Sequence, residues 1–327
     1  MKKPLLTALI VTYNHKNHIS KAIESVLAQK TNFDFQIWIL DDCSTDGTSD
    51  IVREYANKYP EKIIHILREH NLGGIQNAYQ AISKIDTKYY STLEGDDYWT
   101  DENKLQIQVD ILENNPDCSF CAHNTLKKYP TNENHIQHNQ QYLKSKIKTG
   151  KYKFPKNVKR DYIEPHYSSR VYRTSCLNLD KIKNPLIVCY DTAVTFWFLQ
   201  FGNLYYIDKI MSVYNYTYQG VYSGLSVQMQ KHMGAGVIVQ INEAFDFKYN
   251  NMFLDFFKKK IPISLIQYLK IKYFTGKKDL PGAYKNILDN YFKKDQIRLN
   301  SKLLFRIALP VNKRKTICLE LRREKEM

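Results

Sequence analysis

The sequence has few cysteines for its length, six among 327 residues. That number does not make the disulfide framework of a small secreted domain. One C-x-x-C pair, Cys118 and Cys121, lies inside an apolar, strand-like run, and no second pair follows at the spacing of a zinc site. We therefore expect buried thiols rather than zinc or redox chemistry.

Long apolar runs are also absent, and no stretch approaches the roughly 20 residues that span a bilayer. The first residues, "MKKPLLTALIVTYN", begin with basic residues and an apolar run, as a signal peptide does. They lack a small-residue cleavage site, and the run ends in polar residues, so we interpret it as a first strand. We expect a cytoplasmic protein.

The net charge of +15 is unevenly distributed along the chain. Residues 1–126 carry a net charge of −6, residues 127–160 carry +9, residues 161–250 carry 0, and residues 251–327 carry +12. A nucleic-acid enzyme would build its basic groove from the main domain, which here is acidic. We therefore expect no nucleic-acid partner.

Strand and helix patterns alternate over the first 126 residues. Strands are expected at 5–14, 35–40, 62–67, 88–93 and 118–124, with helical spacing at 19–27, 51–59, 73–83 and 102–113. Because the strand runs are continuously apolar, they favour an α/β fold with a mostly parallel central sheet and helices on both faces.

The rest of the chain divides by composition. Residues 127–160 form a polar, basic insertion, and residues 161–226 return to strands at 166–173 and 204–216 around a helix that begins at Asp191. Residues 227–327 have mostly helical patterns. We expect one domain over 1–226, made of halves at 1–126 and 161–226 around the insertion, followed by a basic helical extension over 227–327.

Polar groups follow three of the expected strands: Thr12–Asn14, Asp41–Asp42 and Glu94–Asp97. The carboxyl ends of parallel strands meet at one edge of the sheet, where such folds bind ligands. Adjacent carboxylates repel each other unless a cation compensates them, so Asp96 and Asp97 indicate a site for a hard metal ion. An acidic turn, or a cap of the next helix, is the alternative for each group taken alone.

The chain resembles the family 2 glycosyltransferases, which use the GT-A nucleotide-sugar fold. The resemblance covers residues 5–216 and rests on six strings in the family's order. They are "LIVTYNH", "ILDDCSTDGT", "HNLGGIQNAYQAI", "STLEGDDYW", "HYSSRVYR" and the helix that begins at Asp191.

The resemblance implies a UDP-sugar donor and the residues that bind it. Asp42 would contact the uracil with support from Asp41, and Asp97 and Asp96 would hold Mn²⁺ or Mg²⁺. The remaining donor-site candidates are Val11, Thr12, Tyr13, Asn77 and Trp99. Two of these have structural alternatives, because Tyr13 and Trp99 could equally be core side chains. Glu94 stands where many relatives have Asp.

Asp191 resembles the family's catalytic base, which deprotonates the acceptor hydroxyl. Asp is also a favoured helix N-cap, and the two roles are compatible. The resemblance thus implies an inverting, metal-dependent transferase that moves a sugar from a UDP-sugar to a hydroxyl of a glycan or lipid-linked acceptor in cell-surface polysaccharide or oligosaccharide synthesis. A non-catalytic sugar-nucleotide binder or scaffold is the alternative. Sugar-1-phosphate nucleotidyltransferases are excluded, because the first strand is followed by no glycine-rich loop.

The basic residues 251–327 are interleaved with apolar side chains, as in "KLLFRIALPVNKRK". Such a tail can be a solvated helical extension, or it can dock on an anionic membrane surface. In the second case, the protein would be peripheral on the inner face of the cytoplasmic membrane, next to a lipid-linked acceptor.

Overall fold

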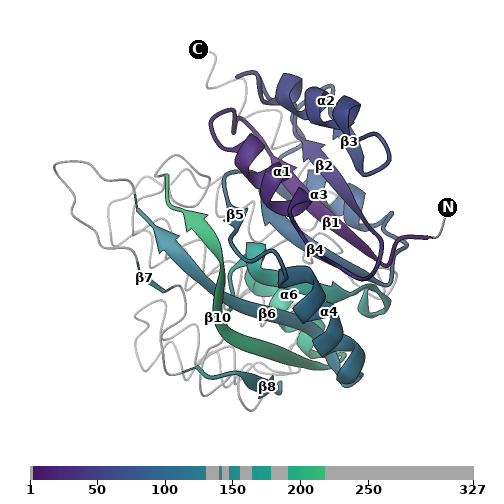
Figure 1. The fold of residues 1–327 in the computed structure, drawn as a ribbon, viewed down its shortest axis with the longest axis vertical. Coiled ribbons are helices and arrows are strands. Elements are labelled where there is room, and N and C mark those ends of the chain that lie inside the picture. Colours follow the sequence, from purple (N-terminus) through teal and green to yellow (C-terminus); the bar gives the residue numbers. More distant parts are fainter. Residues whose placement is uncertain (1–2, 130–139, 142–146, 155–163, 178–190, 218–327) are drawn as a thin grey trace, which may run out of the picture. The chain divides into compact units, whose positions relative to one another are not determined.

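The computed structural model describes residues 3–129, 140–141, 147–154, 164–177 and 191–217 (Figure 1). All of these residues belong to one of the chain's two compact units. The described helices and 3₁₀ turns are α1 (Ile19–Leu27), α2 (Thr48–Lys58), α3 (Gly74–Ile82), α4 (Lys104–Asn114), η1 (Tyr167–Ser169), η2 (Thr174–Cys176) and α6 (Asp191–Leu199). The described strands are β1 (Leu6–Thr12), β2 (Phe35–Asp41), β3 (Ile63–Leu67), β4 (Tyr89–Glu94), β5 (Tyr98–Trp99), β6 (Cys118–Lys128), β7 (Gln140–Gln141), β8 (Gly150–Tyr152), β9 (Arg170–Arg173) and β10 (Asn203–Asn215).

The described strands form one ten-stranded sheet whose main path runs β3-β2-β1-β4-β9-β6-β10-β5. The first four strands of this path are parallel, as predicted. Their register brings three strand ends level, because Thr12 pairs with Asp41 and Val11 pairs with Glu94. The polar groups that follow β1, β2 and β4 therefore lie at the same edge of the sheet.

The second half of the sheet departs from the simple parallel order. β9 lies between β4 and β6 and runs antiparallel to both. β6 therefore points in the same direction as β4, and β10 runs parallel to β6 (Figure 1). As a result, the carboxyl ends of β6 and β10 lie at the same edge as the carboxyl end of β4.

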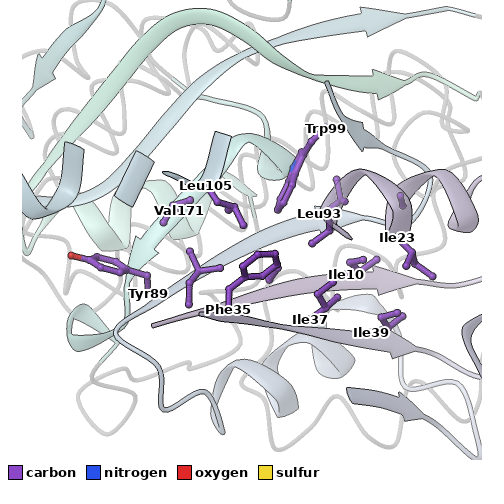
Figure 2. Close-up of a cluster of buried hydrophobic side chains, with 14 of the residues drawn as sticks. Ile10, Ile23, Phe35, Ile37, Ile39, Tyr89, Leu93, Trp99, Leu105 and Val171 are labelled. Atoms are coloured by element: carbon purple, nitrogen blue, oxygen red, sulfur yellow. The ribbon is translucent and has the colours of Figure 1, made fainter. Parts of the chain in front are cut away.

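One hydrophobic core joins α1, α2 and α4 to alternate residues of the parallel strands (Figure 2). Ile23 of α1 and Leu105 of α4 belong to it, together with strand residues such as Ile10 and Tyr89. Successive strand side chains point to opposite faces. Accordingly, the neighbouring Tyr90 packs in a separate cluster of aromatic rings with Phe120, Tyr172 and Phe198 of α6.

The predicted elements of the first 126 residues are confirmed in order and type. β6 runs to Lys128, two residues beyond the predicted end of the first half. The predicted strand at 166–173 is a 3₁₀ turn followed by the short β9. Within the described ranges, no helix is both long and apolar enough to cross a membrane. The extension at 227–327 and its boundary lie outside the described residues.

Candidate active site

The acidic turn after β4 sits directly against the end of β1. The Gly95 N–H donates to the Val11 carbonyl at 2.8 Å. A Cβ atom at Gly95 would lie 2.6 Å from Thr12 Oγ1 and 2.9 Å from His15 Nδ1, which is closer than side chains approach. Only glycine therefore allows this turn to bring Asp96 and Asp97 beside the first strand.

The Asp97 carboxylate is completely buried and fixed from two other elements. Ser168 Oγ donates to Asp97 Oδ2 at 2.6 Å, and the Asn215 N–H at the end of β10 donates to Asp97 Oδ1 at 3.0 Å. The Asn215 side chain also donates to the Asp96 carbonyl at 2.6 Å. The acidic turn is thus held in one orientation by η1 and β10 together.

His166 completes the group of side chains at this point. One ligand atom each from Glu94, Asp97 and His166 lies within 4.8 Å of the others. Burial, with a smaller effect of Arg170 and Lys127, lowers the pKa of His166 to about 3, so the imidazole is neutral. The sequence did not single out His166, although it opens the quoted string "HYSSRVYR".

The residues of this cluster fit a divalent cation. His166 Nδ1 accepts the Ser168 N–H at 3.3 Å, and it lies 3.6 Å from Asp97 Oδ2. A neutral imidazole therefore lies beside a buried carboxylate, and both are donor types that bind a divalent cation. Carboxylates suit Mg²⁺ and Mn²⁺ alike, whereas a neutral imidazole favours the softer Mn²⁺.

Asp41 and Asp42 both hold loops beside the site. Asp41 accepts from the hydroxyls of Ser44 and Ser49 and is completely buried. These contacts within the turn match the structural alternative for Asp41, an acidic turn that follows the strand. Asp42 accepts from the backbone N–H groups of Leu72 and Gly73, both at 2.8 Å. Asp42 therefore fixes the loop before α3 at the carboxyl edge of the sheet.

Asn77 is buried completely, and both ends of its amide are in use. Its Oδ1 accepts from Arg68 Nε at 2.9 Å, and its Nδ2 donates to the Leu40 carbonyl at 3.5 Å. These contacts attach α3 to the ends of β2 and β3. They favour a structural role for Asn77 over the predicted contact with the donor.

The other predicted donor-site residues divide between the site and the core. Tyr13 has 44% of its surface exposed at the end of β1, whereas Thr12 is buried and its hydroxyl lies 3.3 Å from His15 Nδ1. Val11 is partly exposed. Trp99 belongs to the core, where its indole N–H donates to the Ser168 carbonyl at 2.8 Å (Figure 2). Of the two roles considered for Trp99, the structure favours packing.

Asp191 is the first residue of α6, as predicted, and its side chain lies outside the described part of the structure. The other end of α6 is attached near the amino ends of β6 and β10. There Ser119 Oγ donates to the Phe198 carbonyl at 2.6 Å. A nine-residue helix is about 13 Å long, so the start of α6 lies well away from that attachment.

Two of the solved structures that share the fold serve as examples. They are a *Staphylococcus aureus* TarS fragment in complex with UDP-GlcNAc (TM-score 0.59, 17% identity, covering 88% of this chain and 80% of that one) and the mannosyltransferase PcManGT of *Pyrobaculum calidifontis* in complex with GDP-Man and Mn²⁺ (TM-score 0.54, 13% identity, covering 98% and 85%). These likenesses confirm the predicted GT-A fold.

Relatives with curated names match part of the chain. The uncharacterized protein Rv1520 of *Mycobacterium tuberculosis* is 38% identical over 36% of this chain and 34% of its own length. The putative teichuronic acid biosynthesis glycosyltransferase TuaG of *Bacillus subtilis* is 34% identical over 34% of this chain and 42% of its own length. These matches span less than half the length of either relative.

A family profile covers more of the sequence. Residues 7–177, about half of the chain, match Glycosyl transferase family 2. This range includes the ends of β1, β2 and β4, the acidic turn, and both His166 and Ser168. The chain therefore belongs to glycosyl transferase family 2.

Proposed function

We propose that this protein is an inverting, metal-dependent glycosyltransferase. It moves a sugar from a UDP-sugar to a hydroxyl group of a glycan or lipid-linked acceptor in cell-surface polysaccharide or oligosaccharide synthesis. The observation that carries this proposal is the cluster of the buried Asp97 and His166 with the partly buried Glu94 at the carboxyl edge of the sheet. Membership of the family and the name of TuaG support the same reading.

Asp97, His166 and Glu94 would hold Mn²⁺ or Mg²⁺, and Asp96 lies next to them in the same turn. A bound metal ion would act as a Lewis acid that offsets charge on the departing nucleotide. Ser168 and Asn215 keep the Asp97 carboxylate in its orientation before substrate arrives. Such preorganisation reduces the rearrangement that the reaction has to drive.

Val11, Thr12, Tyr13 and Asp42 would form the base-binding end of the donor site. Each carboxylate oxygen of Asp42 can accept two hydrogen bonds, so it can hold the 72–73 loop and still accept a uracil N–H. The TarS complex contains UDP-GlcNAc, which supports a UDP donor, while PcManGT contains GDP-Man. Asp41 supports this region through Ser44 and Ser49.

Asp191 would be the general base on the acceptor side. It takes the proton of the acceptor hydroxyl while the oxygen attacks the anomeric carbon. The bond from that carbon to the nucleotide diphosphate breaks, and the configuration inverts. A positioned carboxylate of this kind contributes typically 10²–10⁴-fold to the rate.

The test substitutes Asp191→Asn, which keeps a good helix N-cap while removing the base. We expect UDP affinity and the unfolding temperature to stay near those of the wild type, while turnover of the UDP-sugar drops by about 10²-fold or more. Turnover within about threefold of the wild type would show that Asp191 is not the base. If the wild-type protein binds UDP but releases no UDP from any UDP-sugar in the presence of acceptor, it is instead a non-catalytic binder.

Attachment to an anionic membrane surface stays a prediction. It rests on the net charge of +12 in residues 251–327, which lie outside the described residues. Flotation with anionic and neutral liposomes at low and high salt tests it. An electrostatic anchor requires anionic lipid and is released by salt.

A further inference from the structure

Lys127 and three tyrosines share one face at the ends of β6 and β10. Lys127 pairs with Tyr214 across the two parallel strands. Because strand side chains alternate between faces, Tyr129 follows Lys127 on the same face of β6, and Tyr216 follows Tyr214 on the same face of β10. Lys128, which pairs with Asn215, points to the opposite face and is exposed.

The three rings surround the Lys127 ammonium group. Lys127 Nζ lies 3.8 Å from the ring centroid of Tyr216, 4.8 Å from that of Tyr129 and 5.8 Å from that of Tyr214. The electron-rich faces of aromatic rings attract a cation at such distances. The tyrosines therefore hold the ammonium group in place, and they do so without cancelling its charge.

The described part of the chain places no carboxylate within ion-pair distance of Lys127. The side chain is only partly exposed, so water screens its charge less than it screens a surface lysine. A partly buried cation without an anionic partner attracts an anion from solution.

The cluster borders the candidate metal centre. The imidazole of His166 stacks on the Tyr214 ring with centroids 4.4 Å apart. One ring therefore separates the Lys127 cation from a residue of the metal cluster. The sheet topology also places the Lys127 cluster next to the metal cluster, because β4, β6 and β10 all end at this edge of the sheet.

From this juxtaposition we infer that Lys127 is an anion-binding side chain that contacts a phosphate oxygen of the donor's diphosphate. This inference rests on the proposed function, because it assumes a nucleoside-diphosphate donor at the metal cluster. A metal ion and a lysine on two sides of the diphosphate would share its charge. The lysine would then stabilise the leaving group as well as the bound donor.

A purely structural role for Lys127 is the competing explanation, in which the cation only joins β6 to β10 through the tyrosines. The two roles differ in what the lysine recognises. A structural lysine affects folding and treats a nucleoside and its diphosphate alike, whereas a phosphate-binding lysine affects only the diphosphate.

Calorimetric binding of UDP and of uridine to the full chain in Mn²⁺ separates the two roles. Lys127→Met should weaken UDP binding about tenfold, the loss expected for one charge-assisted hydrogen bond, and leave uridine binding unchanged. Lys128→Met removes the neighbouring charge from the opposite face and should leave both affinities within about twofold of the wild type. Lys127→Arg keeps the charge and should retain most of the UDP affinity.

Equal effects of Lys127→Met and Lys128→Met on UDP binding would overturn the inference, as would equal loss of UDP and uridine binding. If Lys127→Met does not fold, labelling of the wild-type lysines with an amine reagent gives the answer. UDP with Mn²⁺ should protect Lys127 and not Lys128, and absence of that protection would also overturn the inference. If the wild type binds no UDP, the donor assignment fails, and the same comparison is made with GDP and guanosine.

Discussion

Ser168 joins two residues of the metal cluster to a tryptophan of the core. Its hydroxyl donates to Asp97 Oδ2 at 2.6 Å, its N–H donates to His166 Nδ1 at 3.3 Å, and its carbonyl accepts the indole N–H of Trp99 at 2.8 Å. Ser168 is completely buried, so water does not replace these contacts. It is a positioning residue for the metal cluster.

Ser168→Ala should therefore lower the affinity for Mn²⁺ about fivefold to tenfold, since one buried hydrogen bond to a carboxylate is lost. Ser169→Ala is the matched control. Ser169 is equally buried, and its hydroxyl donates to the His166 carbonyl at 2.6 Å rather than to a candidate ligand. Electron paramagnetic resonance of free Mn²⁺ measures both affinities. An equal effect of the two substitutions would show that Ser168 acts only through the fold.

Lys104 is a buried charge that the site does not use. Its side chain is completely buried, and Nζ has no hydrogen-bond partner within the described residues. Nζ lies 4.0 Å from the ring centroid of Trp99. Burial lowers the pKa of Lys104 from 10.5 to about 7. Keeping this amine in the core costs stability, most of all when it is charged.

Lys104→Met keeps the length of the side chain and should raise the free energy of unfolding at pH 7 by about 2 kcal/mol. The folded pKa lies below the unfolded one, so wild-type stability rises between pH 7 and pH 10.5 as the buried amine stays neutral. The advantage of the variant should therefore shrink over that range. Urea unfolding of both proteins at pH 6.5 and pH 9.5 measures the difference in their free energies of unfolding. A difference that stays constant or grows with pH would show that a buried Lys104 amine is not its cause.

Among the elements, the turn after β4 depends on Gly95. An added Cβ would overlap Thr12 Oγ1 at 2.6 Å and Thr12 Cβ at 2.7 Å. Gly95→Ala should therefore push the acidic turn away from β1. We expect a loss of about 1–3 kcal/mol in stability together with weaker Mn²⁺ binding.

Gly74→Ala is the control for this change. Gly74 is the first residue of α3, and no atom lies within 4 Å of an added Cβ. Alanine is the better helix former there, so stability should stay the same or rise by up to about 1 kcal/mol. Thermal unfolding and Mn²⁺ titration measure the stability and the Mn²⁺ affinity of both variants. Unchanged Mn²⁺ binding by Gly95→Ala would show that the turn does not need its place beside β1.

The sequence predicted the elements that have strong local patterns. Continuous apolar runs and helical spacing gave β1 to β4 and α1 to α4 in order, with ends within a few residues. The antiparallel place of β9 between β4 and β6 was not predicted. Strand partners depend on tertiary packing, and the pattern of one strand does not encode its neighbour.

The same limit applies to the candidate site. Asp42, Asp96 and Asp97 were predicted because they directly follow apolar strands. His166, Ser168 and Asn215 reach Asp97 from segments about 70 to 120 residues further along, so no local spacing revealed them. The structural roles of Asn77 and Trp99 depend on burial and on single hydrogen bonds, which the sequence does not show either.

In the molecule as a whole, the features proposed for function converge at one edge of one sheet. The described ends of β1, β2, β4, β6 and β10 supply the Asp42 loop, the metal cluster and the Lys127 cluster. Strands that are far apart in the sequence come together there because they run in the same direction. We propose that this edge is a metal-dependent site for a sugar nucleotide.

UDP release from a panel of UDP-sugars tests this proposal, measured with metal-stripped wild type and with Asp97→Ala. We expect no UDP release by the wild type in EDTA and recovery of release when Mn²⁺ is restored. Asp97→Ala should fold and yet release no UDP at any Mn²⁺ concentration. Full activity of the wild type in EDTA, with the protein shown to be free of metal, would show that the site does not depend on a metal ion.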